Sequence, residues 1–202
     1  MPMKPLGDIF YEHWLPGVLA WMVIYISDYV CTILSARLYH AKAKAHIVFE
    51  GSFELNPVFE ADVNKLRWIS PRFVILLVLI SSMLAGYWAM TQWIPGVEFA
   101  YPTVLGALVL MECAVHMRHI RNLALFRGLR KGGISGQVTY QRGFIFRNSA
   151  AELLSFACLF SLISLLQGSW FFLGGTLSCF GVAVKHWILA RRWEKRRRAI
   201  AS

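Results

Sequence analysis

Three side chains that could bind a proton or a metal ion share one helical face in the apolar run that starts near Tyr101. Glu112, His116 and His119 follow one another at intervals of four and three residues, so a helix would carry them on the same side. Ionisable groups inside a membrane span are costly and by default mark a functional site. The stretch from Glu112 to His119 therefore indicates a polar centre within a membrane-spanning helix.

Asp28 adds a carboxylate from an earlier apolar run, and Thr32 follows it on the same helical face. A lone carboxylate in a span needs a partner or must be protonated, so Asp28 is the strongest single candidate for a functional group. With Glu112, His116 and His119 it would offer two oxygens and two nitrogens, a set that suits a divalent metal such as zinc or iron. Proton relay, ion pairing and a structural hydrogen-bonded cluster are alternatives that the sequence leaves open.

The segment Glu54-Leu-Asn56-Pro57 offers a further carboxylate and amide. Gly51 and the Asn-Pro pair break any helix there, so the segment either folds back into the polar centre or forms a surface turn. The D-x3-T pattern at Asp28 followed by this E-x-N-P pattern resembles small, uncharacterised bacterial multi-spanning membrane proteins over roughly residues 28–57. That resemblance implies a membrane location and no particular activity.

Two more ionisable groups belong to the last two apolar runs. Glu152 and Lys185 fall at similar depths, which predicts an ion pair between them. Gly174, Ser178 and Gly181 precede Lys185 at helical spacing, and small residues let helices approach closely. We expect this seam to bring Lys185 into the bundle. A buried pair of this kind is as suited to fixing helix register as to chemistry.

The elements that must position these groups are five membrane spans. The chain has 202 residues, of which 57% are hydrophobic, and such a composition is too apolar for an ordinary soluble domain. We predict one all-α transmembrane domain followed by a basic tail at 191–202, and a short hairpin or interfacial turn at 137–141. The predicted spans cover about 16–36, 71–93, 101–122, 149–166 and 170–190.

Basic residues predict the orientation of these spans. Of the 21 Lys and Arg residues, six fall in 37–72, seven in 118–147 and six in the tail. Five spans place these three regions on one side, so the positive-inside rule puts the N-terminus outside and the C-terminus in the cytoplasm. The positive charge is then explained by topology and by anionic lipid headgroups, without nucleic acid. We expect an integral protein of a bacterial inner membrane.

In this orientation the ionisable groups within the spans all lie in the cytoplasmic half, which predicts a protein-lined pocket open to the cytoplasm. One hypothesis is a proton- or cation-linked transporter or carrier, working as a homodimer or larger ring because five spans leave little room for a pathway. A second is a metal-dependent intramembrane enzyme, in which Arg118, Arg121 and Arg147 grip the phosphate of a lipid or isoprenoid substrate. A third is a non-catalytic scaffold or regulator, whose polar cluster specifies helix packing.

Overall fold

The computed structural model describes residues 10, 12–41, 43–51, 54–56, 58–130 and 136–201. The described part of the chain is mostly helical and contains two very short strands. Its elements, in chain order, are α2 (Trp14–Ala41), the 3-10 helix η1 (Ala43–Ala45), β1 (Ile47–Phe49), α3 (Glu60–Asn64), α4 (Pro71–Trp93), α5 (Ala100–Arg130), β2 (Val138–Tyr140), α6 (Arg142–Gln167) and α7 (Trp170–Ala201).

Five of these helices, α2, α4, α5, α6 and α7, are long and apolar enough to cross a membrane. The predicted fold class, an all-α bundle of five such helices, is therefore confirmed. Each predicted span lies within one helix, and α4 has the predicted bounds because Ser70 caps its start and accepts a hydrogen bond from the amide of Phe73. The other helices are longer than the spans, since Lys and Arg extend a helix readily once it leaves the apolar layer.

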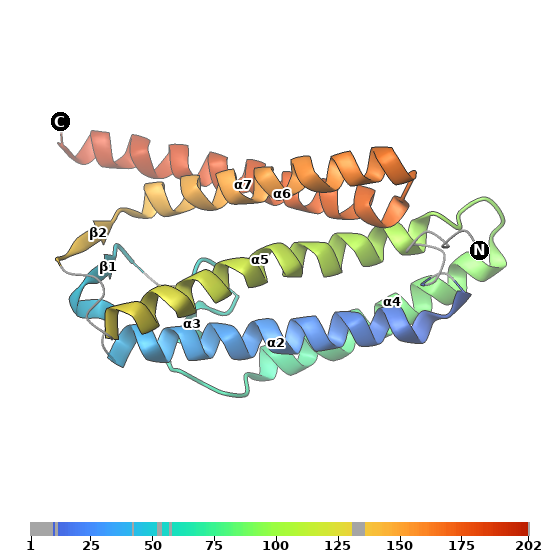
Figure 1. The fold of residues 1–202 in the computed structure, drawn as a ribbon, viewed down its shortest axis with the longest axis horizontal. Coiled ribbons are helices and arrows are strands. Elements are labelled where there is room, and N and C mark those ends of the chain that lie inside the picture. Colours follow the sequence, from blue (N-terminus) through green and yellow to red (C-terminus); the bar gives the residue numbers. More distant parts are fainter. Residues whose placement is uncertain are drawn as a thin grey trace.

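Helix α5 lies in the middle of the bundle (Figure 1). It packs against α7 on one side and against α2 on the other, while α6 pairs with α7, and α4 packs mainly on α2. The side chains predicted to form the polar centre come mostly from α2 and α5, which are neighbours. The order of packing therefore lets Asp28 and the two histidines meet.

Glycines hold α5 and α7 close together near the turn between α6 and α7. A Cβ atom added at Gly106 would overlap the backbone carbonyl of Phe171, and one added at Gly174 would overlap that of Thr103. Farther along α7 the close approach ends, because a Cβ at Gly181 would meet nothing within 4 Å. The predicted seam is therefore correct at Gly174 and wrong beyond it, and Lys185 is exposed instead of buried in the bundle.

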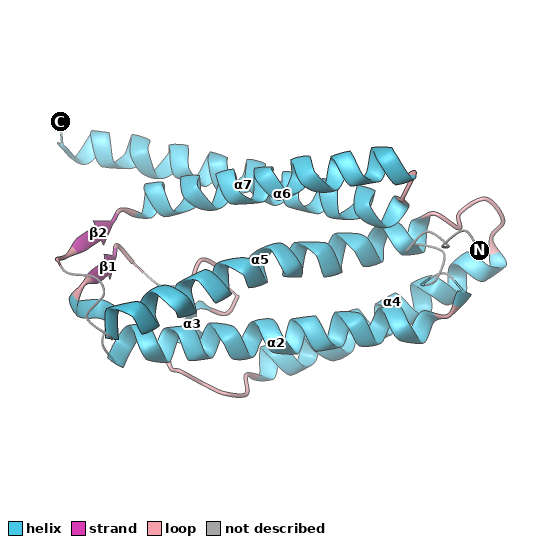
Figure 2. Ribbon diagram, in the orientation of Figure 1, coloured by secondary structure: helices cyan, strands magenta, loops and turns pink. Residues whose placement is uncertain are grey.

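The opposite end of the molecule, which we call the basic end, carries the described residues of the connections 42–70 and 131–141 and the end of α7. There β1 and β2 pair in parallel, with Ile47 opposite Val138 and Phe49 opposite Tyr140 (Figure 2). Of the two alternatives predicted at 137–141, the hairpin is therefore wrong, since β2 pairs with a strand about 90 residues earlier in the chain. This small sheet ties the first connection to the start of α6.

Candidate functional site

The carboxylate of Asp28 meets two histidines of α5 in the half of the bundle nearer the basic end. Its Oδ1 atom lies 3.2 Å from Nε2 of His119 and 3.8 Å from Nδ1 of His116. The same Nε2 atom of His119 lies 3.1 Å from the hydroxyl of Thr32, while Ser27 Oγ lies 3.4 Å from Nε2 of His116. The structure thus brings together four residues that the sequence singled out on two separate helices.

Several polar atoms of this cluster are buried without a hydrogen bond. Among the described residues, Asp28 Oδ1, His116 Nδ1 and His119 Nδ1 have no hydrogen-bonding partner, so the short approach of His119 to Asp28 is an electrostatic contact without hydrogen-bond alignment. His119 as a whole is only 8% exposed. Buried unpaired polar atoms are rare in folded proteins and call for an explanation such as a functional role. This cluster retains capacity to bind a proton or a cation.

The cluster opens into a cavity of about 540 Å³ between α2, α5 and α7, which we call the aspartate cavity. Besides Asp28, Thr32 and His119, it is lined by Glu112, which forms no ion pair within the described part of the chain, and by the exposed Lys185. Two carboxylates from α2 and α5 therefore face one space. Lys185 contributes a positive charge at its edge.

The E-x-N-P segment folds back against the same cavity, which is lined by Glu54 and Asn56. Glu54 Oε1 accepts a hydrogen bond of 2.7 Å from the amide of Asn56, and Asn56 Oδ1 accepts one of 3.1 Å from the amide of Val58. These bonds hold the segment in a turn, while Pro57 lies outside the described residues. Burial raises the pKa of Glu54 above its ordinary value, with Asp28 adding to the effect and His119 opposing it.

The metal hypothesis gains no support from this geometry. Within the described residues no group of three or more His, Cys, Asp or Glu side chains is arranged to hold a metal ion. Glu112 lines the cavity, but no hydrogen bond or ion pair joins it to Asp28 or to the histidines in the described part of the chain. A zinc or iron site at Asp28, Glu112, His116 and His119 stays a prediction.

Glu152 pairs with two arginines of α5 and not with Lys185, which corrects the predicted ion pair. Its Oε2 atom lies 3.1 Å from Nε of Arg118, and its Oε1 atom contacts the guanidinium of Arg121. Equal depth in the bundle does not bring two residues together unless their helix faces also meet. The face of α6 that carries Glu152 turns toward α5, whereas Lys185 of α7 is exposed.

The three arginines predicted to grip a headgroup do not form one group. Arg118 and Arg121 share Glu152, but Arg147 contacts Glu194 near the end of α7. Arg147 instead lines a separate groove with Trp193, Arg196 and Arg197. The structure therefore does not bring the three arginines together in one phosphate site.

The contacts of several other lining residues were not predicted from the sequence. His186, which follows Lys185, lies 2.9 Å from the hydroxyl of Ser149 and lines the aspartate cavity. Phe49 and Tyr140 line an adjoining cavity, where their rings stack with centroids 5.6 Å apart. No local signal could have paired these two aromatic residues, because they meet through the β1–β2 contact.

No protein-family model, curated protein or solved structure matches this chain.

Proposed function

We propose that this chain is an integral membrane protein that acts as a proton- or cation-linked carrier, with Asp28 as the group that binds the proton or cation. The observation that carries the proposal is the approach of Asp28 Oδ1, which accepts no hydrogen bond in the described part of the chain, to Nε2 of His119 at 3.2 Å and to Nδ1 of His116 at 3.8 Å. A carboxylate and an imidazole that lie this close can exchange a proton with little movement.

Histidine suits this role because its ordinary pKa lies near neutral pH, so small changes of surroundings alter its charge. When His119 is protonated, it compensates the charge of Asp28. A cation bound beside Asp28 would compensate the same charge, since an isolated carboxylate in an apolar layer is costly. Glu112 and Glu54 line the same cavity and extend the acidic path from the cluster.

The setting of the proposal follows from charge. The connections and tail at the basic end hold most of the lysines and arginines, so we infer that this end faces the cytoplasm of a bacterium and that the aspartate cavity opens to that side. Anionic lipids of the inner membrane would contact the basic residues there. A homo-oligomer would supply the remaining walls of a pathway.

Reconstitution into liposomes tests the proposal. Liposomes that contain a trapped pH-sensitive dye are given a pH gradient, and in parallel assays a gradient of sodium, potassium, magnesium, manganese or zinc ions. We expect the wild-type protein to accelerate dissipation of at least one gradient, and Asp28→Asn to reduce the rate to that of protein-free liposomes. Asparagine keeps the shape of the side chain but can neither bind a proton nor carry the charge.

Glu98→Gln provides the matched control, because it also removes one carboxylate charge. Glu98 lies in the exposed connection between α4 and α5, away from the cavity, where it accepts a hydrogen bond from the amide of Gly96. This variant should retain wild-type flux. Wild-type protein that transports none of these ions, or equal flux in the Asp28→Asn variant, would contradict the proposal. Lowered thermal stability without any change of flux would favour a scaffold role.

A further inference from the structure

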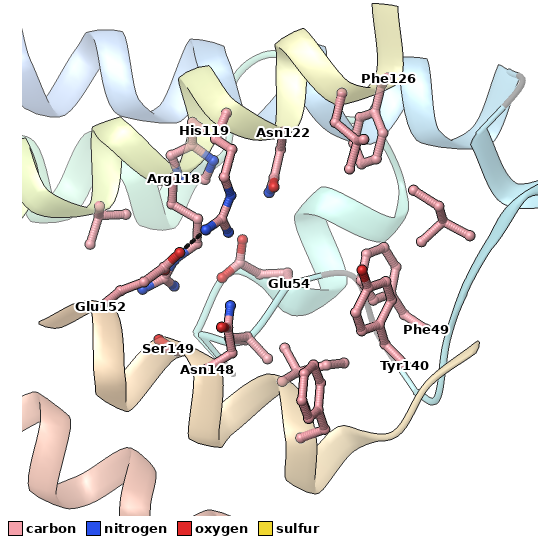
Figure 3. Close-up of a pocket in the computed structure, with 17 residues that line it drawn as sticks. Phe49, Glu54, Arg118, His119, Asn122, Phe126, Tyr140, Asn148, Ser149 and Glu152 are labelled. Atoms are coloured by element: carbon pink, nitrogen blue, oxygen red, sulfur yellow. Dashed lines mark hydrogen bonds and ion pairs between the residues drawn. The ribbon is translucent and has the colours of Figure 1, made fainter. Parts of the chain in front are cut away.

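A second cavity of about 450 Å³ adjoins the aspartate cavity and shares Glu54, Arg118 and His119 with it. It lies between α5, α6 and the two short strands. Figure 3 shows that polar and aromatic side chains occupy different parts of its wall. The polar part comprises Glu54, Arg118, Arg121, Asn122, Asn148 and Glu152, and the aromatic part comprises Phe49, Phe126, Tyr140 and Phe144.

The polar part brings two guanidinium groups together. Arg118 and Arg121 both contact Glu152, so two guanidinium groups share one carboxylate. The remaining carboxyl group is Glu54, and burial raises its pKa, which favours its uncharged form. Guanidinium groups bind phosphate and carboxylate through paired hydrogen bonds. Charge complementarity therefore selects an anionic group for this part of the cavity.

Two carboxamides add neutral hydrogen-bonding groups beside the arginines. Asn122 comes from α5 and Asn148 from α6, and both side chains lie near Glu54 (Figure 3). Neither makes a side-chain hydrogen bond among the residues that the structure describes. Because a carboxamide can both donate and accept, these groups can bind the oxygens of a head group without adding charge.

The aromatic part continues from the polar part toward the surface. Tyr140 stacks on Phe49 and on Phe144, with ring centroids 5.6 and 5.8 Å apart. Phe144 is 53% exposed, so this wall is not closed by other elements of the chain. Aromatic faces bury a large apolar area, which an inorganic ion alone would leave in contact with water.

We propose that this second cavity binds an anionic amphiphile with a single hydrocarbon chain, its phosphate or carboxylate head at Arg118 and Arg121 and its chain along Phe49, Tyr140 and Phe144. A cavity of this volume is in the range of small-molecule sites. The inference rests on the proposed carrier function, because it identifies the amphiphile as the cargo that moves with the proton or cation. Glu54, Arg118 and His119 would then contact both the cargo and the ion site.

Binding to the full chain in phosphatidylcholine nanodiscs tests the inference. Radiolabelled dodecyl phosphate is titrated, and empty nanodiscs measure its partitioning into lipid. Laurate, dodecanol, dodecyltrimethylammonium and inorganic phosphate serve as competitors. We expect saturable binding of about one dodecyl phosphate per chain, displaced by laurate but not by dodecanol, the cationic amphiphile or phosphate ion.

Two variants locate the site. Arg121→Gln should weaken binding about tenfold, because it removes one charged donor to the head, and the exposed Arg127→Gln on the same helix should not. Phe144→Ala should also weaken dodecyl phosphate binding, since it shortens the apolar wall while disturbing little of the core. Each variant is compared with wild type for thermal stability, so that a misfolded variant is recognised.

Several outcomes would overturn the inference: no saturable binding above empty nanodiscs, equal competition by dodecanol, stronger binding of the cationic amphiphile, or an unchanged affinity in a folded Arg121→Gln variant. Displacement by inorganic phosphate at similar concentration would indicate a phosphate ion site and would also refute an amphiphile. If these tests fail while ion flux still depends on Asp28, the carrier proposal stands without this cargo. If dodecyl phosphate binds while flux is independent of Asp28, the carrier proposal fails and the site remains.

Discussion

The two arginines that contact Glu152 should contribute unequally to stability. The side chains of Glu152 and Arg118 are 23% and 16% exposed, whereas that of Arg121 is 53% exposed. At the 3.1 Å separation of Arg118 and Glu152, the gross attraction at an effective dielectric constant of about 20 is about 5 kcal/mol. Desolvation offsets much of this attraction, but removing one partner leaves a buried charge uncompensated.

We therefore expect Glu152→Gln to lower the free energy of unfolding by about 3 kcal/mol. Arg121→Gln should lower it by less than about 1 kcal/mol, because water screens an exposed pair. A double-mutant cycle should give a coupling of about 2 kcal/mol between Arg118 and Glu152. The cycle between Lys185 and Glu152 should give none, since Lys185 is exposed and lies in no ion pair with Glu152 among the described residues.

The measurement is reversible unfolding in mixed micelles, in which increasing dodecyl sulfate is followed by tryptophan fluorescence. Each cycle uses the two single variants and the double variant, with glutamine at every position to keep side-chain length similar. A larger coupling for Lys185 than for Arg118 would show that the sequence-based pairing was right and that the contact of Glu152 with the arginines of α5 is misassigned. Equal couplings for the two arginines would refute the argument from burial.

Two further predictions concern packing and pH. Gly106→Ala should lower the free energy of unfolding by about 3 kcal/mol or more, because the added Cβ overlaps the backbone of Phe171 and α5 must move away from α7. Gly86→Ala, whose Cβ meets no atom within 4 Å, should be neutral or stabilise the protein by up to about 1 kcal/mol. The same micelle titration measures both variants. Because the pKa of Glu54 is raised, the folded protein holds the proton of this carboxyl group more tightly than the unfolded chain does. The contribution of Glu54 to stability is therefore present below its ordinary pKa of 4.5. It is lost as pH rises through the pKa of Glu54 in the folded protein. The Tm of Glu54→Gln relative to wild type should therefore increase with pH above 4.5, and a pH-independent difference would contradict the burial of this carboxyl group.

The sequence predicted those features that depend on local pattern. Apolar runs located all five long helices, and the span predicted at about 71–93 has the bounds of α4. The spacing of Asp28 and Thr32 on one helix, and of His116 and His119 on another, also indicated which faces carry polar groups. Because α2 and α5 pack side by side, these faces can meet, and their meeting shields polar atoms from an apolar layer.

Features that depend on distant parts of the chain could not be predicted in this way. Depth along a span predicted Glu152 beside Lys185, but depth does not specify the rotation of a helix about its axis. The aromatic wall needs β1 and β2 to pair in parallel, and two three-residue strands carry almost no sequence signal. The wrong pair of Glu152 with Lys185 and the wrong hairpin at 137–141 both concern which elements lie next to each other. Tertiary packing decides this, and periodicity does not.

The position of the two cavities follows from the shape of the contact between α5 and α7. Glycines bring these helices together at the end of the bundle that carries the α6–α7 turn, and the close approach does not continue to Gly181. The E-x-N-P segment lies where the helices separate, and it leaves room on both sides of α5. Consecutive residues of a helix point about 100° apart, so His119 faces α2 while Arg118 faces α6. One turn of α5 therefore links the ion cluster to the amphiphile cavity, and a shift of that turn that breaks one contact must also alter the other.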